Sequence, residues 1–530
     1  MSALLPFPSR QLRQALTGLI VCSLLPLMAQ QTAPAGHGSY TKLRAERGQS
    51  ATADHSKFKV LQGPFKDGDG SAVTRACLSC HTKAAAQVMA TKHWNWRPSD
   101  KKLEGYGKST HLVNNFCIST IGGNQEACAR CHAGYGMKDS GFDYTKAENV
   151  DCLVCHDTTG DYEKIKGGYP NPAVPLADIA QKVGRPGNQN CGVCHFFGGG
   201  ADATKHGDLD DTILKAPRAV DVHLSKQGAG MACTDCHLSQ AHEIAGPGYI
   251  EAADRREQPR FPGEPMSRMS CAACHTASPH ASFVLNRHYR KVACQTCHIP
   301  AFARGGLASN LSWTWSTAGK LKEGRPYEER DAQGLETYNT IHGDMVWAKD
   351  VKPEYVWYDG HMAFTRLTDT ISPARPVVLN PLQGSYADPE AKIWPFKRHD
   401  GDQPFDPVLN RFIAPWTAGP KGSGAYWGDY DWDRAIRLGM EKAGLPWSGK
   451  YDFVKTQMWW PITHMVAPKT QALACTECHS RQGRLDRVAG FYLPGRDRGA
   501  GVDFLGWSAV LLTFCAVAVH GAFRFLSSRS

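Results

Sequence analysis

The pattern Cys-x-x-Cys-His occurs eight times in this chain of 530 residues and constrains its fold more than any other feature. The two cysteines of such a pattern bond to the vinyl groups of a haem, and the histidine becomes the proximal iron ligand. Zinc sites also use Cys-x-x-Cys pairs, but they need no histidine directly after each pair. We therefore predict eight covalently bound haem c groups. The motifs, numbered in chain order, are Cys77/Cys80/His81, Cys128/Cys131/His132, Cys152/Cys155/His156, Cys191/Cys194/His195, Cys233/Cys236/His237, Cys271/Cys274/His275, Cys294/Cys297/His298 and Cys475/Cys478/His479.

This number of haems also determines the expected fold class. Eight macrocycles would form much of the hydrophobic core, so the polypeptide can be poor in regular structure, and its 52 glycines and 32 prolines agree with that. We predict a mainly α multihaem cytochrome c with extensive loops and a haem-packed core. The formal charge of +10 is no sign of a nucleic-acid partner, because haem propionates would offset much of it. We predict no nucleic acid.

The first 35 residues have the pattern of an export signal. Arg10 and Arg13 precede an apolar run from Ala15 to Leu27, and small residues follow. Cys22 would leave with this signal peptide. Export agrees with the haem motifs, because c-type haems are attached outside the bacterial cytoplasm.

The other end of the chain has the composition of a membrane span. Residues Phe504 to Phe523 contain no acidic or basic side chain except His520 and are enough to cross a bilayer. Arg524 and Arg529 would lie in the cytoplasm. His520 could meet the haem or quinone site of a membrane partner, or could reach the interface. We predict a periplasmic protein held to the inner membrane by a C-terminal transmembrane helix.

These features divide the chain into four parts. We expect a signal peptide at 1–35, a seven-haem region with the active site at 36–300, and a transmembrane anchor with a short tail at 501–530. The remaining part, 301–500, is rich in aromatic residues and would cover the haems while carrying the eighth one. A helix from Asp433 to Ala443 is expected as the longest regular element between Ile299 and Thr470. Acids there, such as Glu354 and Asp359, could bind a cation such as calcium or nothing.

Each motif supplies one axial ligand, so every haem that is not catalytic needs a second ligand. Fourteen histidines lie outside the motifs, enough for bis-histidine ligation of seven haems. Spacing does not reveal which histidine serves which haem. The predicted distal ligands are His93, His206, His223, His242, His288, His399 and His464, followed by His280.

The stretch from Asn114 to Lys166 adds two features to its pair of motifs. Cys117 belongs to no motif and is either a buried small hydrophobe or an active-site thiol. Lys164 and Lys166 follow the third motif. A lysine near a haem is usually a solvated charge or a propionate partner, and it binds iron only if burial removes its proton.

Several of these residues stand in longer segments that resemble the octahaem tetrathionate reductase family, related to pentahaem nitrite reductases and octahaem hydroxylamine oxidoreductases. The segments are Asn114-Asn115-Phe116-Cys117, Cys-Leu-Val-Cys-His-Asp-Thr-Thr-Gly at the third motif, Cys-Gln-Thr-Cys-His-Ile-Pro at the seventh, and Pro395-Phe396-Lys397. The resemblance implies that the second haem is catalytic, with a distal lysine on its iron. It implies that Asp161 and Lys164 are the family's aspartate and lysine pair, with Lys166 as the alternative ligand. The implied catalytic residues are Asn114, Cys117, His132, Asp161 and Lys164.

The expected function is reduction of small sulfur or nitrogen oxyanions, for which tetrathionate, nitrite and hydroxylamine are the candidate substrates. Electrons would come from a membrane cytochrome b or quinol-oxidising subunit, or from a soluble cytochrome. The alternatives are a non-catalytic electron-transfer subunit and a hydroxylamine-oxidising enzyme. The membrane span departs from soluble members of the family.

Overall fold

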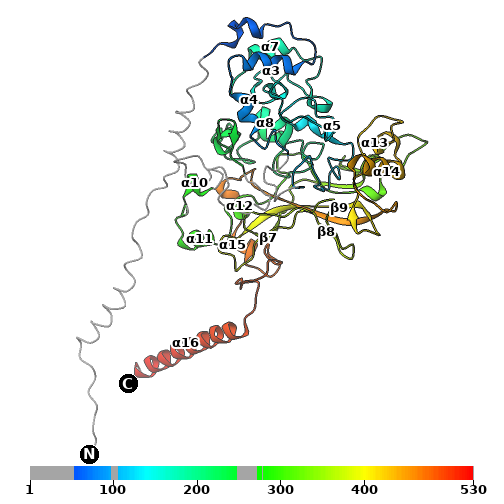
Figure 1. Ribbon diagram of the computed structural model, residues 1–530. Helices are drawn as coiled ribbons and strands as arrows, with labels where there is room; N and C mark the ends of the chain where they lie inside the picture. The colour runs from blue at the N-terminus through cyan, green and yellow to red at the C-terminus, as the bar shows by residue number, and fades with distance from the viewer. Residues whose placement is uncertain (1–52, 97–104, 247–270, 277, 529–530) are drawn as a thin grey trace, which may run out of the picture.

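A computed structural model describes residues 53–96, 105–246, 271–276 and 278–528. The expected signal peptide, with Cys22, lies outside the described residues. Short helices and loops make up one end of the body, and a twisted sheet makes up the other (Figure 1). A long C-terminal helix extends away from the body on the side of the sheet.

Eight of the fourteen α-helices in the described residues lie at or beside the haem motifs, and six of these eight are single turns of four or five residues. The cysteines of a motif are three residues apart, so one helical turn brings both thiols to the same face. The helices at or beside the motifs are α3 (Gly70–Leu78), α5 (Gln125–Cys128), α6 (Leu153–His156), α8 (Asn188–His195), α9 (Cys233–Cys236), α10 (Ala272–His275), α12 (Cys294–His298) and α15 (Cys475–Cys478). The others are α4 (Ala84–Met89), α7 (Leu176–Gln181), α11 (Phe283–His288), α13 (Tyr426–Asp429), α14 (Trp432–Ala443) and α16 (Ala500–Ser527).

The aromatic-rich region forms a nine-stranded sheet with the order β4-β5-β6-β3-β9-β11-β8, and β7 and β10 also pair with β9. Its centre is the antiparallel pair of β9 and β11, in register from Asp452 opposite Phe405 to Pro461 opposite Phe396. The strands are β3 (Ser309–Thr314), β4 (Glu328–Arg330), β5 (Glu336–Asn339), β6 (Gly343–Ala348), β7 (Glu354–Tyr358), β8 (Val377–Val378), β9 (Lys392–Asp406), β10 (Arg411–Phe412) and β11 (Asp452–Pro461). A separate hairpin joins β1 (Ser239–Gln240) to β2 (Glu243–Ile244).

This sheet corrects two predictions. The mainly α fold class is wrong for this region, and its longest element is the 15-residue strand β9 rather than the helix α14, which has 12 residues. The aromatic residues there suit a half-buried pleated surface, and many pack on the sheet itself.

The sheet also holds the loop that carries Cys117. Val113, Phe116 and Ile118 are almost fully buried in one cluster with sheet residues such as Trp313 and Phe405. A segment that precedes the second motif is thereby fixed by residues of the sheet region that lie 200 to 341 positions later in the chain.

Helix α16 has 28 residues and a mean hydropathy of 2.0 over its most apolar window, and none of that window is buried. Its length and composition suffice to cross a membrane.

Candidate active site

A cavity of about 3440 Å³ runs through the part of the body that carries the motifs. Cysteines of the first six motifs line it. Pockets for single small molecules measure roughly 300–1,000 Å³, so this cavity has room for several large groups.

Within the described residues, no cluster of three or more His, Cys, Asp or Glu side chains is placed to hold a metal ion. Glu354 pairs with Arg398 at 2.7 Å, and Asp359 accepts a hydrogen bond from the His361 backbone.

Seven of the eight motif histidines face a second histidine from outside the motifs. The ring centroids in these pairs are 5.9 to 6.4 Å apart. The pairs are His81 with His55, His156 with His242, His195 with His93, His237 with His464, His275 with His223, His298 with His280, and His479 with His288.

This spacing fits one metal ion between each pair of rings. A metal lies about 2.0 Å from an imidazole nitrogen, and the nitrogen lies about 1.1 Å from the ring centre, so two rings on one ion have centres about 6.2 Å apart. The residues present therefore suit bis-histidine haem iron at seven motifs.

Hydrogen bonds made by the ring nitrogen Nδ1 hold many of these histidine rings in place. Among the motif histidines, His156 Nδ1 donates to Gly184 O at 2.7 Å. Among their partners, His242 Nδ1 lies 2.9 Å from Gln87 Oε1 and His288 Nδ1 lies 2.8 Å from Val284 O. A proton on Nδ1 leaves Nε2 as the free acceptor, which is how most metal-binding histidines are oriented.

The structure thus brings six of the predicted distal histidines to motif histidines: His93, His223, His242, His280, His288 and His464. The other two do not pair. His399 is fully buried in β9, and its ring nitrogens lie within hydrogen-bond distance of the amides of Asn115 and Asn310. His206 packs instead against Trp460, with ring centroids 5.5 Å apart. The seventh partner is His55, which faces His81. No pattern in the sequence marks His55 as a ligand.

The second motif differs from the other seven, because His132 has no histidine partner among the described residues. Its ring lies in an aromatic cage made by Trp94, Trp96, Phe142 and Tyr144, with centroid distances of 5.0 to 6.2 Å. Its Nε2 donates to Trp94 O at 2.6 Å. Burial lowers the pKa of His132 to about 4, so the ring is neutral at physiological pH.

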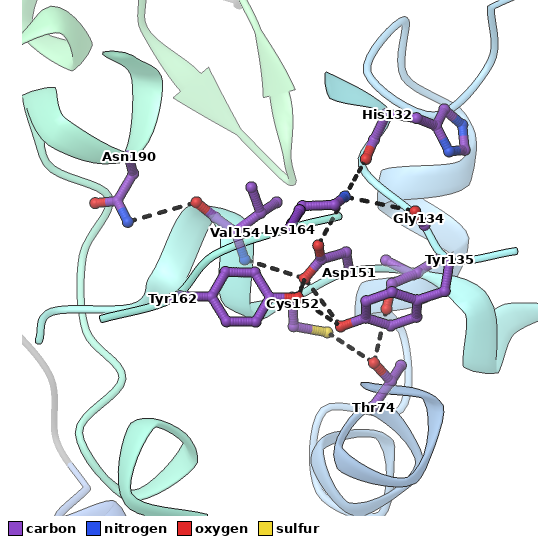
Figure 2. Close-up of polar contacts among 11 residues, drawn as sticks. Thr74, His132, Gly134, Tyr135, Asp151, Cys152, Val154, Tyr162, Lys164 and Asn190 are labelled. Atoms are coloured by element: carbon purple, nitrogen blue, oxygen red, sulfur yellow. Dashed lines mark hydrogen bonds and ion pairs between the residues drawn. The ribbon is translucent and has the colours of Figure 1, made fainter. Parts of the chain in front are cut away.

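Next to the backbone of His132 lies a buried cluster of polar groups centred on Lys164 and Asp151 (Figure 2). Lys164 Nζ lies 2.9 Å from Asp151 Oδ2 and donates to the backbone oxygen of His132. Asp151 Oδ1 accepts from the hydroxyls of Tyr135 at 2.9 Å and Tyr162 at 3.0 Å. Both members of the ion pair are almost inaccessible, with side chains 4% and 0% exposed.

The carboxylate beside Lys164 therefore belongs to Asp151, not to Asp161, which is exposed. Asp151 was missed, although its place directly before the third motif could have marked it as a residue close to a haem. Lys166 is exposed as well. A smaller cavity of about 400 Å³ is lined by Lys164, Arg130 and Arg185, among other residues.

Asn114 shapes the loop that presents Cys117. Its Oδ1 accepts the backbone N–H groups of Phe116 and Cys117, both at 2.9 Å. Asn115 fastens the same loop to the sheet, because its Oδ1 accepts from Thr456 Oγ1 at 2.7 Å. Cys117 lines the large cavity, and burial raises the pKa of its thiol to about 12. A thiol with so high a pKa is a poor nucleophile at neutral pH.

Lys108 and Lys205 line the same cavity near the second motif. The spacing of the motifs did not reveal either lysine. Lys205 Nζ lies 4.0 Å above the ring of Trp460, and Lys108 Nζ lies 4.5 Å from that of Trp96. Neither has an ion-pair partner in the part of the chain that the structure describes. Burial, together with Lys108, lowers the pKa of Lys205 to about 7. This side of the cavity can therefore offer positive charge to an anion.

Three comparisons place the chain among known proteins. A family model described as bacterial cytochrome c matches residues 310–482. An uncharacterized protein of Archaeoglobus fulgidus is 25% identical over 286 residues, which cover 44% of this chain and 92% of that protein. The crystal structure of octaheme cytochrome c from Shewanella oneidensis superposes with a TM-score of 0.72 and 40% identity, covering 82% of this chain and 95% of the other. This chain therefore belongs to the octahaem tetrathionate reductase family of c-type cytochromes.

Proposed function

We propose that this protein is an octahaem oxidoreductase that reduces a small sulfur or nitrogen oxyanion, or hydroxylamine, beside its second motif. One observation carries the proposal: among the described residues, seven motif histidines face a second histidine, and His132 faces none. When bound, the haems supply electron transfer, and a haem with no second histidine is the one that a substrate can reach. Reduction of one tetrathionate consumes two electrons and releases two thiosulfates.

The protein's own residues would bind and orient the anion. Lys108 and Lys205 supply positive charge inside the cavity, where a charge interacts more strongly with an anion than it does in bulk water. Asp151 holds Lys164 beside the backbone of His132, within reach of the second motif. The Asn114 turn sets the wall of the cavity at Cys117.

The surroundings of Cys117 favour a packing role for its side chain over a nucleophilic role. Attack on a sulfur of tetrathionate requires a thiolate, and burial holds the pKa of this thiol at about 12. Its half-buried side chain also packs against the cluster of Phe116 and the sheet.

The haem-loaded protein, reduced by a chemical donor, tests the proposal. We expect turnover of at least one of tetrathionate, nitrite and hydroxylamine, and binding of one carbon monoxide per chain. A reduced protein that binds no carbon monoxide and reduces none of the three would be an electron-transfer subunit instead. Oxidation of hydroxylamine faster than its reduction would reverse the assigned direction.

We further infer that α16 anchors the protein in the bacterial inner membrane, with the haem-bearing body in the periplasm. A membrane cytochrome b or quinol-oxidising subunit would then be the electron donor. Recovery of the full-length protein in membranes, from which alkaline carbonate fails to release it, is the expected result. Release by carbonate would exclude the anchor.

A further inference from the structure

Helix α11 (Phe283–His288) presents three consecutive large apolar side chains to the surface. Phe283, Val284 and Leu285 are 66%, 62% and 44% exposed. Outside α16, no other described stretch exposes three such side chains in a row. Contiguous apolar patches on a protein surface mark sites of contact with another protein, a ligand or a membrane.

The helix is fixed to the eighth motif. The ring of His288 at its end lies 6.2 Å from that of His479. Three residues further on, Lys291 Nζ donates to Tyr386 O at 2.9 Å and to Asp388 O at 2.6 Å. Val292 then packs against the cluster of buried residues that includes Leu485, Val488 and Leu493. Helix α11 and the segment after the eighth motif therefore form one packed unit.

The C-terminal helix leaves from this same unit. Arg496 donates to the backbone oxygens of Leu485, Val488 and Phe491 and pairs with Asp497 at 2.7 Å. Helix α16 begins at Ala500, only three residues after Asp497. Figure 1 shows α11 and α15 at the end of the body from which the chain runs to α16. So short a connection keeps this end of the body close to whatever surface α16 enters.

The side chains around the connection suit a lipid headgroup layer. Arg287 and Arg290 are exposed beside the apolar triplet, and Arg481, Arg487 and Arg498 are exposed between the eighth motif and α16. Basic side chains are attracted to anionic lipid headgroups. Tyr492 is half exposed in the same segment, and tyrosine is enriched at the membrane interface.

We propose that α11 lies in the surface of the bilayer that α16 crosses, with Phe283, Val284 and Leu285 inserted at the level of the headgroups. This inference rests on the proposed anchoring by α16. The protein would then have two membrane contacts, one spanning and one interfacial, on either side of the eighth motif. The eighth haem site would be held at the membrane face while the second motif lies elsewhere in the body.

Hydrogen exchange of the full-length haem-loaded protein tests the contact. We compare the protein in nanodiscs of phosphatidylglycerol and phosphatidylcholine with the protein in an amphipathic polymer that wraps only α16. Amides of residues 283–290 should exchange at least tenfold more slowly in the nanodiscs. The F283E/V284E/L285E variant should lose this protection from exchange. The Val408→Glu variant should keep it, because Val408 is an exposed valine (59%) elsewhere on the surface.

Equal exchange of residues 283–290 in both environments would overturn the membrane contact. The three apolar side chains would then be assigned to contact with a protein partner. Protection that survives in the triple variant would overturn the membrane contact as well. Exchange across α16 in the same experiment reports whether the anchor is inserted, and no substrate is involved. A failure of the contact is thus distinguished from a failure of the anchor or of the oxyanion reductase activity.

Discussion

Asp151 and Lys164 form an ion pair of 2.9 Å in which neither side chain is more than 4% exposed. The lysine is also hydrogen-bonded to the backbone of His132, and the aspartate to two tyrosines. The pair therefore links the third motif, which Asp151 directly precedes, to the second motif, whose histidine faces no other histidine in the part of the chain that the structure describes.

Replacement of Asp151 by Asn should be strongly destabilising. It leaves the charge of Lys164 buried without its counterion, and removal of one partner from a buried pair costs about 3–5 kcal/mol. The exposed Asp161 provides the matched control, and Asp161→Asn should change stability by less than about 0.5 kcal/mol. Thermal unfolding of the haem-loaded variants measures both effects. Equal melting temperatures for the two variants would contradict the pairing.

Replacement of His55 by Leu should expose the iron site of the first motif. His55 is the histidine that faces His81, at 6.2 Å between ring centroids, so its loss removes one axial ligand. We expect the reduced variant to bind one more carbon monoxide per chain than the unmodified protein. His206→Leu should bind no more, because His206 faces Trp460. The opposite result for the two variants would restore His206 as a ligand.

Replacement of Lys205 by Gln should weaken binding of anionic substrates. Loss of one buried positive charge near an anion is expected to raise KM for tetrathionate or nitrite about tenfold, or about 1.4 kcal/mol. KM for hydroxylamine, which is uncharged above pH 6, should change little. Steady-state kinetics with both kinds of substrate provides the measurement, and a parallel rise in both KM values would argue against an electrostatic role.

The same lysine predicts a pH dependence. Burial lowers the pKa of Lys205 to about 7, so its charge is present below that pH and lost above it. Affinity for an anionic substrate should therefore fall as the pH rises from 6 to 8. The Lys205→Gln variant should show a flatter profile over this range. An unmodified protein whose KM for the anion does not change between pH 6 and pH 8 would refute this assignment.

Replacement of Cys117 by Ala should leave most of the activity. The thiol has a pKa of about 12 and packs beside Phe116, so its loss removes a small buried group rather than a thiolate. We expect less than a tenfold drop in kcat for tetrathionate. Cys117→Ser keeps the size of the side chain and serves as the control. A loss of more than a hundredfold in both variants, with unchanged melting temperatures, would show that the sulfur takes part in the reaction.

The eight haem motifs could be predicted because each is complete within five consecutive residues. The distal histidines are a different problem, since His464 meets His237 from the far half of the chain. A histidine such as His399, buried between two asparagine amides, looks the same in the sequence as one that faces a haem site. The fold, not the local pattern, separates them.

The sheet and Asp151 were missed for related reasons. Aromatic residues of 301–500 suit both a haem face and a pleated strand, and strand pairing such as Trp460 with Lys397 depends on residues 63 positions apart. Asp151 stands next to a motif, where its partner Lys164 was known only as one of two lysines. Lys164 is buried and Lys166 is exposed, and this difference arises only in the folded chain.

The pairing of His237 with His464 also bears on how the protein is assembled. A chain made from its N-terminus presents the fifth motif more than 200 residues before it presents His464. If His464 is the second ligand at the fifth motif, a haem attached there early would lack that ligand until the residues that follow β11 have been synthesised. The eighth motif has the reverse order, because His288 is already in place when His479 emerges. The predicted ligand pair at the fifth motif would therefore be complete only after the last strand of the C-terminal sheet, β11, has been made.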